Sequence, residues 1–214
     1  MMSEYDLRGF PSFIFLDTSG GLLYGKEPYW RPDSLMALEM GLEEVESIFQ
    51  LRKHVAENPD DQVARARLTL IEGLLNPARA NVAAMDVAAS VKGVPAELVA
   101  EWKASRLAIR FLVVFEPYRI AYQEDAADKD QKRAEVVTFC YEGVKSGETM
   151  DVDQEWFRPF WILAFDGARE AEDEKIARTC FAAYEDAYGV QDRYWKKMKE
   201  QLEELVQNKA GTAG

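Results

Sequence analysis

The sequence holds few of the residues that enzymes most often use for chemistry. Its 214 residues include only two cysteines and one histidine. Cys140 and Cys180 lie far apart and no Cys-x-x-Cys occurs, so spacing indicates neither a redox pair nor a zinc knuckle. Each cysteine has apolar neighbours in a helical pattern, and we expect both to be buried packing residues. His54 lies on a charged helix end without a second histidine, which predicts a surface residue rather than a catalytic or metal-binding one.

Other signatures of catalysis are also missing. There is no Gly-rich phosphate loop, nucleophile elbow or metal-ligand cluster, so we assign no catalytic residue, no cofactor and no metal. Asp125, Asp128 and Asp130 lack the alternation and the central glycine of a calcium loop, and we interpret them as part of a solvated loop.

Long apolar runs are absent as well. Apolar runs such as those near 13–16 and 111–115 are the size of core segments and far too short to cross a bilayer. Residues 1–10 have neither the basic start nor the apolar stretch of a signal peptide. This favours a cytoplasmic location, unless the chain is a fragment whose signal peptide lies upstream.

The residues that are present predict a folded and acidic protein. Hydrophobic residues make up 48% of the chain and charged residues 30%, which is typical of a globular protein. The net charge of −12 repels phosphate backbones and anionic lipid, so we expect neither nucleic acid nor membrane as a partner.

Residues 1–57 contain the only strand signals. A β-branched and aromatic run at 12–16 and a shorter one at 22–24 flank the turn residues 17–21, which together predict a β-hairpin. Asp33 or Ser34 can then cap a helix, whose apolar residues recur at helical spacing toward Val55.

Residues 58–214 show only helical patterns. We expect Pro77, Pro117 and several glycines to interrupt them, and these interruptions predict helices near 61–75, 78–91, 96–115, 130–146, 153–166, 170–188 and 190–208. Helix pairs of this length suit a repeat array of the tetratricopeptide kind, although the consensus of that repeat is not legible. The predicted fold is mainly α: a ββα unit at 1–57 and an all-helical, repeat-type domain at 58–214.

The first unit carries a resemblance. Its residues match in order a hydrophobic-x-Gly-hydrophobic-Pro-Thr stretch, a strand, a glycine turn, a second strand, a glycine and a helix, and the matching positions are Leu7, Gly9, Phe10, Pro11, Ser12, Gly20 or Gly21, Gly25 and 34–45. This segment resembles the C-terminal half of thioredoxin-like proteins, over about a quarter of the chain. The resemblance implies a cis Phe10–Pro11 bond in a loop that contacts substrate, so Phe10, Pro11 and Ser12 become candidate binding residues. A strand-entry proline in trans is the alternative.

The dithiol half of that fold would precede Tyr5, so we expect no dithiol oxidoreductase activity from this chain alone. Without it, the strand edge 12–17 would be unpaired and open to another chain. The helical domain could cover this edge, or another strand could complete it, including one from a second copy in a homo-oligomer. The third alternative, which we favour, is that the chain is a fragment of a longer gene product.

The segment 156–165 is the most aromatic part of the helical domain. Trp156 and Phe160 form one helical stripe, and Phe157, Trp161 and Phe165 form a second. Such stripes are core residues, or they line a groove that binds a peptide. Trp156, Phe160 and Trp161 are therefore added to the candidate binding residues.

Two functions follow from the sequence. The first is a non-catalytic interaction module, in which the helical domain binds a partner or client protein. The second is a fragment of a thiol-disulfide redox protein whose dithiol motif lies upstream of Met1. The partner and the oligomeric state cannot be read from these residues.

Overall fold

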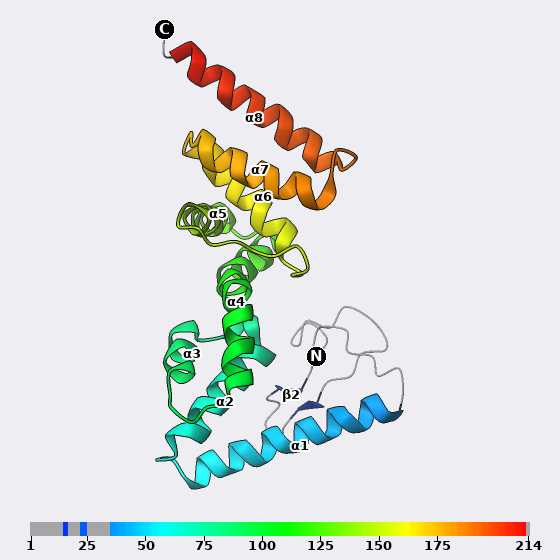
Figure 1. Ribbon diagram of the computed structural model, residues 1–214, viewed down its shortest axis with the longest axis vertical. Helices are drawn as coiled ribbons and strands as arrows, with labels where there is room; N and C mark the ends of the chain where they lie inside the picture. The colour runs from blue at the N-terminus through cyan, green and yellow to red at the C-terminus, as the bar shows by residue number, and fades with distance from the viewer. Residues whose placement is uncertain (1–14, 17–21, 25–34, 213–214) are drawn as a thin grey trace. The chain divides into compact units, whose positions relative to one another are not determined.

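The computed structural model describes residues 15–16, 22–24 and 35–212 (Figure 1). Helices make up most of this part of the chain, which confirms the prediction of a mainly α fold. The α-helices are α1 (Leu35–Glu57), α2 (Gln62–Leu75), α3 (Val82–Ala89), α4 (Ala96–Gln123), α5 (Lys129–Lys145), α6 (Phe157–Glu170), α7 (Glu174–Tyr188) and α8 (Arg193–Thr212), and a 3-10 turn, η2 (Pro77–Arg79), precedes α3.

The chain divides into two compact units, Met1–Arg106 and Leu107–Gly214. The division falls within α4, so the first part of this helix belongs to one unit and its remainder to the other. Residue 57, where the sequence suggested a domain boundary, is the last residue of α1.

In the first unit, α2, α3 and the beginning of α4 supply most of the buried side chains. Leu70 of α2, Met85 of α3 and Trp102 of α4 are almost completely buried. Gly73 lets α2 approach α3 closely, because a Cβ at this position would lie 2.2 Å from Sδ of Met85. Side-chain caps start two of the helices, since Asp61 accepts a hydrogen bond from the Ala64 amide and Asn81 from the Ala84 amide.

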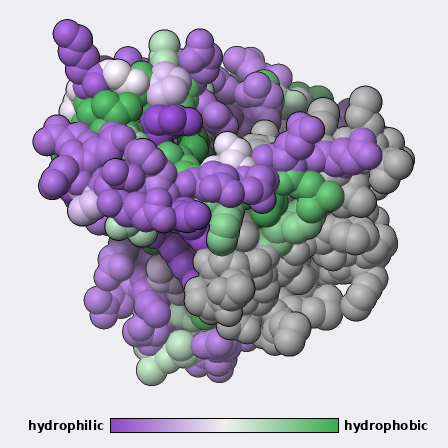
Figure 2. All heavy atoms as spheres, turned by 90° about the horizontal axis from the view of Figure 1, so that it is seen from below, coloured by the Kyte–Doolittle hydropathy of each residue, from purple (hydrophilic) through white to green (hydrophobic). Residues whose placement is uncertain are grey.

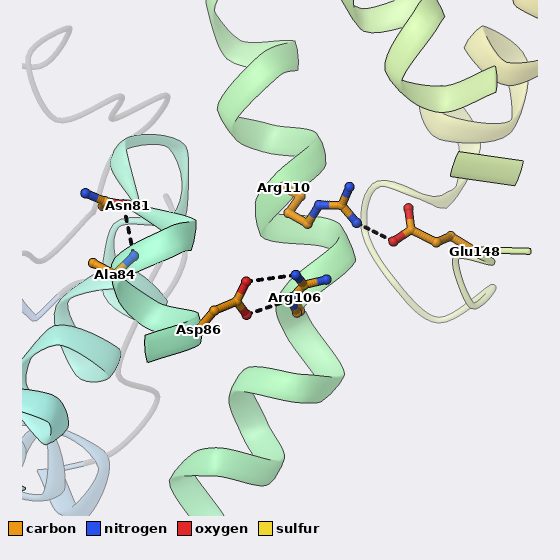
Figure 3. A network of polar contacts seen from close by, with 6 residues as sticks. All are labelled: Asn81, Ala84, Asp86, Arg106, Arg110 and Glu148. Carbon is orange, nitrogen blue, oxygen red and sulfur yellow. Dashed lines mark hydrogen bonds and ion pairs between the residues drawn. The ribbon is translucent and has the colours of Figure 1, made fainter. Parts of the chain in front are cut away.

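An ion pair ties α3 to α4 inside this unit. The guanidinium of Arg106 donates two hydrogen bonds of 2.8 Å to the carboxylate of Asp86 (Figure 3). Such fork-to-fork pairing fixes geometry as well as charge. Both side chains are about two-fifths exposed, so the pair orients the helices more than it stabilises them.

In the second unit, α5, α6, α7 and α8 lie side by side in chain order (Figure 1). The apolar face of α6 is buried, and its residues Phe160, Ala164 and Ala168 have no exposure to solvent. Gly167 permits the close packing of α6 on α5, because a Cβ there would be 3.0 Å from the Val137 carbonyl oxygen. Successive packed helices of this kind are compatible with the repeat-type arrangement expected from the sequence.

Pro117 does not end its helix as the sequence suggested, because α4 continues through it to Gln123. A proline inside a helix removes one backbone hydrogen bond and typically costs ~3 kcal/mol. Here the helix carries buried Phe111 before the proline and buried Ala121 after it. Burial on both sides of Pro117 outweighs its local preference for a helix end.

The assignment of a partial thioredoxin-like fold is wrong. The strands in the described residues are β1 (Phe15–Leu16) and β2 (Leu22–Tyr24), which pair antiparallel with a shift in register after Phe15. Two paired strands of two and three residues do not make a thioredoxin-type sheet. Even a longer isolated hairpin is only marginally stable in water. The expected β-hairpin is therefore not supported as a structural unit, and Pro11 and the matched glycines lie outside the described residues.

Polar groups dominate the face of the described residues that Figure 2 shows. The space-filling view shows mainly hydrophilic side chains, with smaller hydrophobic areas between them (Figure 2). No described helix combines the length and the low charge that a membrane span requires. Cys140 and Cys180 are free and completely buried, as the sequence predicted, and burial raises the pKa of both thiols, that of Cys180 to about 12.

Trp161 offers a direct test of the core of the second unit. Its side chain is only 3% exposed, and its indole N–H donates to the Met150 carbonyl over 3.2 Å. We expect Trp161→Ala to lower the free energy of unfolding by about 3–5 kcal/mol, through lost burial and an unpaired carbonyl. Urea denaturation measures the change, with the exposed Val152→Ala as the matched control; equal stability of the two variants would contradict this position for the indole.

Candidate functional site

The structure separates the three aromatic residues that the sequence grouped as binding residues. Phe160 and Trp161 belong to the buried core of the second unit, whereas Trp156 is half-buried at the start of α6. The other three candidates, Phe10, Pro11 and Ser12, lie outside the described residues, so their contact role and the Phe10–Pro11 bond stay untested predictions.

Four aromatic residues form a row on α4, and Trp156 lies beside two of them. We call these five residues the aromatic ladder. Its members on the helix are spaced four, three and four residues apart, which places them along one face. They are Phe111, Phe115, Tyr118 and Tyr122, with Trp156 beside the first two.

Ring contacts connect the ladder from end to end. Ring centroids are 4.8 Å apart between Phe111 and Phe115, 6.0 Å between Phe115 and Tyr118, and 6.1 Å between Tyr118 and Tyr122. The Trp156 ring lies 5.8 Å from that of Phe115. These separations are within the range in which aromatic pairs attract one another.

The ladder runs from the core to the solvent. Phe111 is completely buried, Phe115, Tyr118 and Trp156 are half-buried, and Tyr122 is 67% exposed. Beside it, Glu116 and Arg119 form a largely buried ion pair one turn apart on α4. The inner rings therefore hold the outer rings in place, and the outer rings leave apolar area exposed to solvent.

A second constellation fixes the beginning of α8. The Arg158 guanidinium of α6 lies 5.1 Å from the ring centroid of Tyr188, 5.4 Å from that of Tyr194 and 5.9 Å from that of Tyr184. It also donates a 2.9 Å hydrogen bond to Oδ2 of Asp192. We call these five residues the Arg158 cluster; it joins side chains of α6, α7 and α8.

Asp192 is the acceptor at the centre of that cluster. Its Oδ1 accepts from the Tyr184 hydroxyl at 3.0 Å and from the backbone amides of Tyr194 at 2.7 Å and Trp195 at 3.3 Å. The carboxylate thus caps α8 while it pairs with Arg158. Desolvation alone would raise the pKa of Asp192, but the hydrogen bonds and the Arg158 charge together lower it.

The one histidine lies in a different setting, in the first unit. Nε2 of His54 is 2.9 Å from Oδ2 of Asp61, and both residues line an open hollow of about 370 Å³ with Ser47 and Arg67. A serine, a histidine and an aspartate in one hollow resemble a hydrolase triad only by composition. Ser47 and His54 are seven residues apart on α1, about 10 Å along the helix axis, whereas a nucleophile and its base must be within hydrogen-bonding distance.

His54 is therefore a half-exposed partner of the α2 cap, in agreement with its expected surface position. Groups of three or more potential metal ligands are not found within the part of the chain that the structure describes. The described residues instead form extended aromatic contacts and ion pairs.

The sequence contained a signal for the ladder that the interpretation of Pro117 concealed. The spacing of Phe111, Phe115, Tyr118 and Tyr122 is that of one helical face, but a helix ending before Pro117 would separate the last two from the first two. The Arg158 cluster had no comparable signal, because its residues come from three helices whose packing only the fold defines.

The role of Asp192 can be tested through pH. Its lowered pKa means that the ionised carboxylate stabilises the folded state above its unfolded pKa of about 3.9, and that this contribution is lost as pH falls through the folded pKa. We expect Asp192→Asn to lower stability at neutral pH and to flatten the fall in stability on acidification. Thermal unfolding at a series of pH values measures both effects, with the exposed Asp186→Asn as the control; parallel curves for the two variants would refute this role.

The comparisons with known proteins give no further assignment. No family model, no curated protein and no solved structure matches the chain. They therefore add nothing in favour of the thioredoxin-like assignment, which the fold already contradicts.

Proposed function

We propose that this chain is a protein-interaction module, and that the outer residues of the aromatic ladder bind a partner protein. The observation that carries the proposal is the continuity of the ladder, from completely buried Phe111 to Tyr122, which is 67% exposed. Tyrosine and tryptophan are the side chains most enriched among residues that dominate binding energy at protein interfaces.

Rigidity of the outer rings supports this function. Tyr118 touches the rings of both Phe115 and Tyr122, and Trp156 touches Phe115, so each outer ring already has a packed neighbour. A side chain that is ordered before binding loses less conformational entropy when the complex forms. The ladder can therefore offer apolar area at a smaller entropic cost than isolated surface aromatics.

The setting of the ladder on a helical array also supports the function. Stacked helices in repeat-type proteins present extended faces, which bind other proteins. The second unit has such successive helices, and α4 carries the ladder at one end of their order. The alternative of a redox fragment depended on the thioredoxin-like assignment and is not retained.

A photo-crosslinking residue in place of Tyr122, introduced in cells of the source organism, tests the function. We expect it to capture a defined protein that the same residue at exposed Val87 of α3, outside the ladder, does not capture. The captured protein is then purified and its affinity for the chain is measured.

Tyr122→Ala should weaken that complex by about tenfold, the loss typical of one well-placed interfacial aromatic, whereas Tyr122→Phe should retain most of the affinity. Circular dichroism should show the same helix content in all variants. Identical capture at both positions, or an unchanged affinity for Tyr122→Ala, would refute the proposal.

A further inference from the structure

The beginning of α8 is positively charged, whereas the chain as a whole is negatively charged. The full sequence carries a net charge of −12, yet residues 193–199 contain four cations and no acid. Arg193, Lys196 and Lys197 are exposed and are spaced three and four residues apart, so they share one side of the helix. We call these three residues the basic face.

The basic face has no acidic partner within the described residues. Ion pairs nearby use other side chains: Arg158 pairs with Asp192, and Lys199 with Glu203. The Asp192 carboxylate is directed inward to Arg158, Tyr184 and the α8 amides, so it does not neutralise the basic face. Glu200, the next residue on that side of α8, marks its end.

These cations also lie where the helix itself disfavours them. The first turn of a helix carries partial positive charge, so acids stabilise it and cations destabilise it. Arg193 and Lys196 are in that turn of α8. Arg193 and Lys197 lie 6.0 and 5.8 Å from the centroid of the Tyr194 ring, but a ring does not neutralise their charge. Departures from a local folding rule without a neutralising partner are expected at functional positions.

Apolar residues lie next to the basic face. Tyr188, the last residue of α7, is 38% exposed, and Val190, in the short connection to α8, is 50% exposed. Val190 is three residues from Arg193, so the two Cα atoms are within about 11 Å of each other. A ligand that covers this region would meet positive charge and open apolar area together.

We infer that the basic face and the adjoining Tyr188 and Val190 bind an acidic segment of the partner protein, one in which carboxylates alternate with apolar side chains. The inference rests on the proposed function, since it names the chemistry of the partner. Carboxylates of the segment would be the negatively charged partners that Arg193, Lys196 and Lys197 do not have among the described residues. Apolar side chains of the segment would cover Val190.

A short acidic peptide fits the charge distribution better than a long polyanion does. Nucleic acid or an anionic membrane would extend beyond the basic face and meet the field of a chain with net charge −12. A peptide segment can be confined to the region where the local charge is positive, within roughly one Debye length of about 8 Å at physiological salt.

The test uses the full chain and a fluorescein-labelled peptide of repeated Glu-Glu-Leu, with a Gln-Gln-Leu peptide for comparison. We expect the acidic peptide to bind more tightly and to lose affinity as NaCl is raised. The triple variant Arg193→Glu, Lys196→Glu, Lys197→Glu should weaken binding by about tenfold or more, because three charge contacts are lost.

The matched control reverses the exposed lysines Lys92, Lys103 and Lys175, which changes the net charge equally outside the basic face. This control should bind the acidic peptide almost as the parent chain does. Acids in the first turn of α8 are favourable, so the test variant should keep its fold, and thermal unfolding verifies this.

Equal affinity for the two peptides, or equal loss in the two triple variants, would overturn the inference, as would binding to phosphatidylserine vesicles without binding to the peptide. A partner captured through residue 122 that binds the basic-face variant with unchanged affinity would overturn this inference alone. Failure to capture any partner at residue 122 would instead count against the proposed function.

Discussion

The second unit depends on the burial of α6 between α5 and α7. Phe160, Ala164 and Ala168 lose all contact with solvent there, and Gly167 lets the α5 backbone approach within a distance that no side chain would allow. The hydrophobic gain from such burial, about 25 cal/mol per Å² of apolar surface, is the main favourable contribution to this packing. The half-buried Trp156 and Arg158 take their positions from this helix, so both surface constellations follow from its placement.

The two surfaces of the second unit use aromatic rings in different ways. In the aromatic ladder, ring contacts extend the core outward and leave the last ring exposed. In the Arg158 cluster, rings surround a cation that is already paired with Asp192, and the Tyr188 ring stays partly exposed. The ladder ends in an exposed ring, whereas the cluster holds the end of α7 and the start of α8 together and thereby positions the basic face.

The positions of the helices could be predicted because each has a periodic apolar face and a polar or glycine-containing end. The predicted segments near 61–75 and 130–146, for example, differ from α2 and α5 by at most one residue at either end. Pro117 misled the interpretation because its local cost is smaller than the packing of α4 on both sides of it. The thioredoxin-like interpretation relied on the order of glycine, proline and short apolar runs, which records turns but not the sheet that would join them. Placement of Trp156 outside the core and of Trp161 within it required the packing of several helices, which no single-helix pattern contains.

The two buried thiols provide a chemical probe for opening of the second unit. Both cysteines of the chain lie in α5 and α7, and the first unit has none. A thiol reagent can reach Cys140 or Cys180 only when this core opens, because both side chains are completely buried. Opening also exposes the thiols to water and removes the desolvation that raises their pKa, so the reactive thiolate can then form. The rate of chemical labelling of the unmodified protein therefore reports how often the core of the second unit opens.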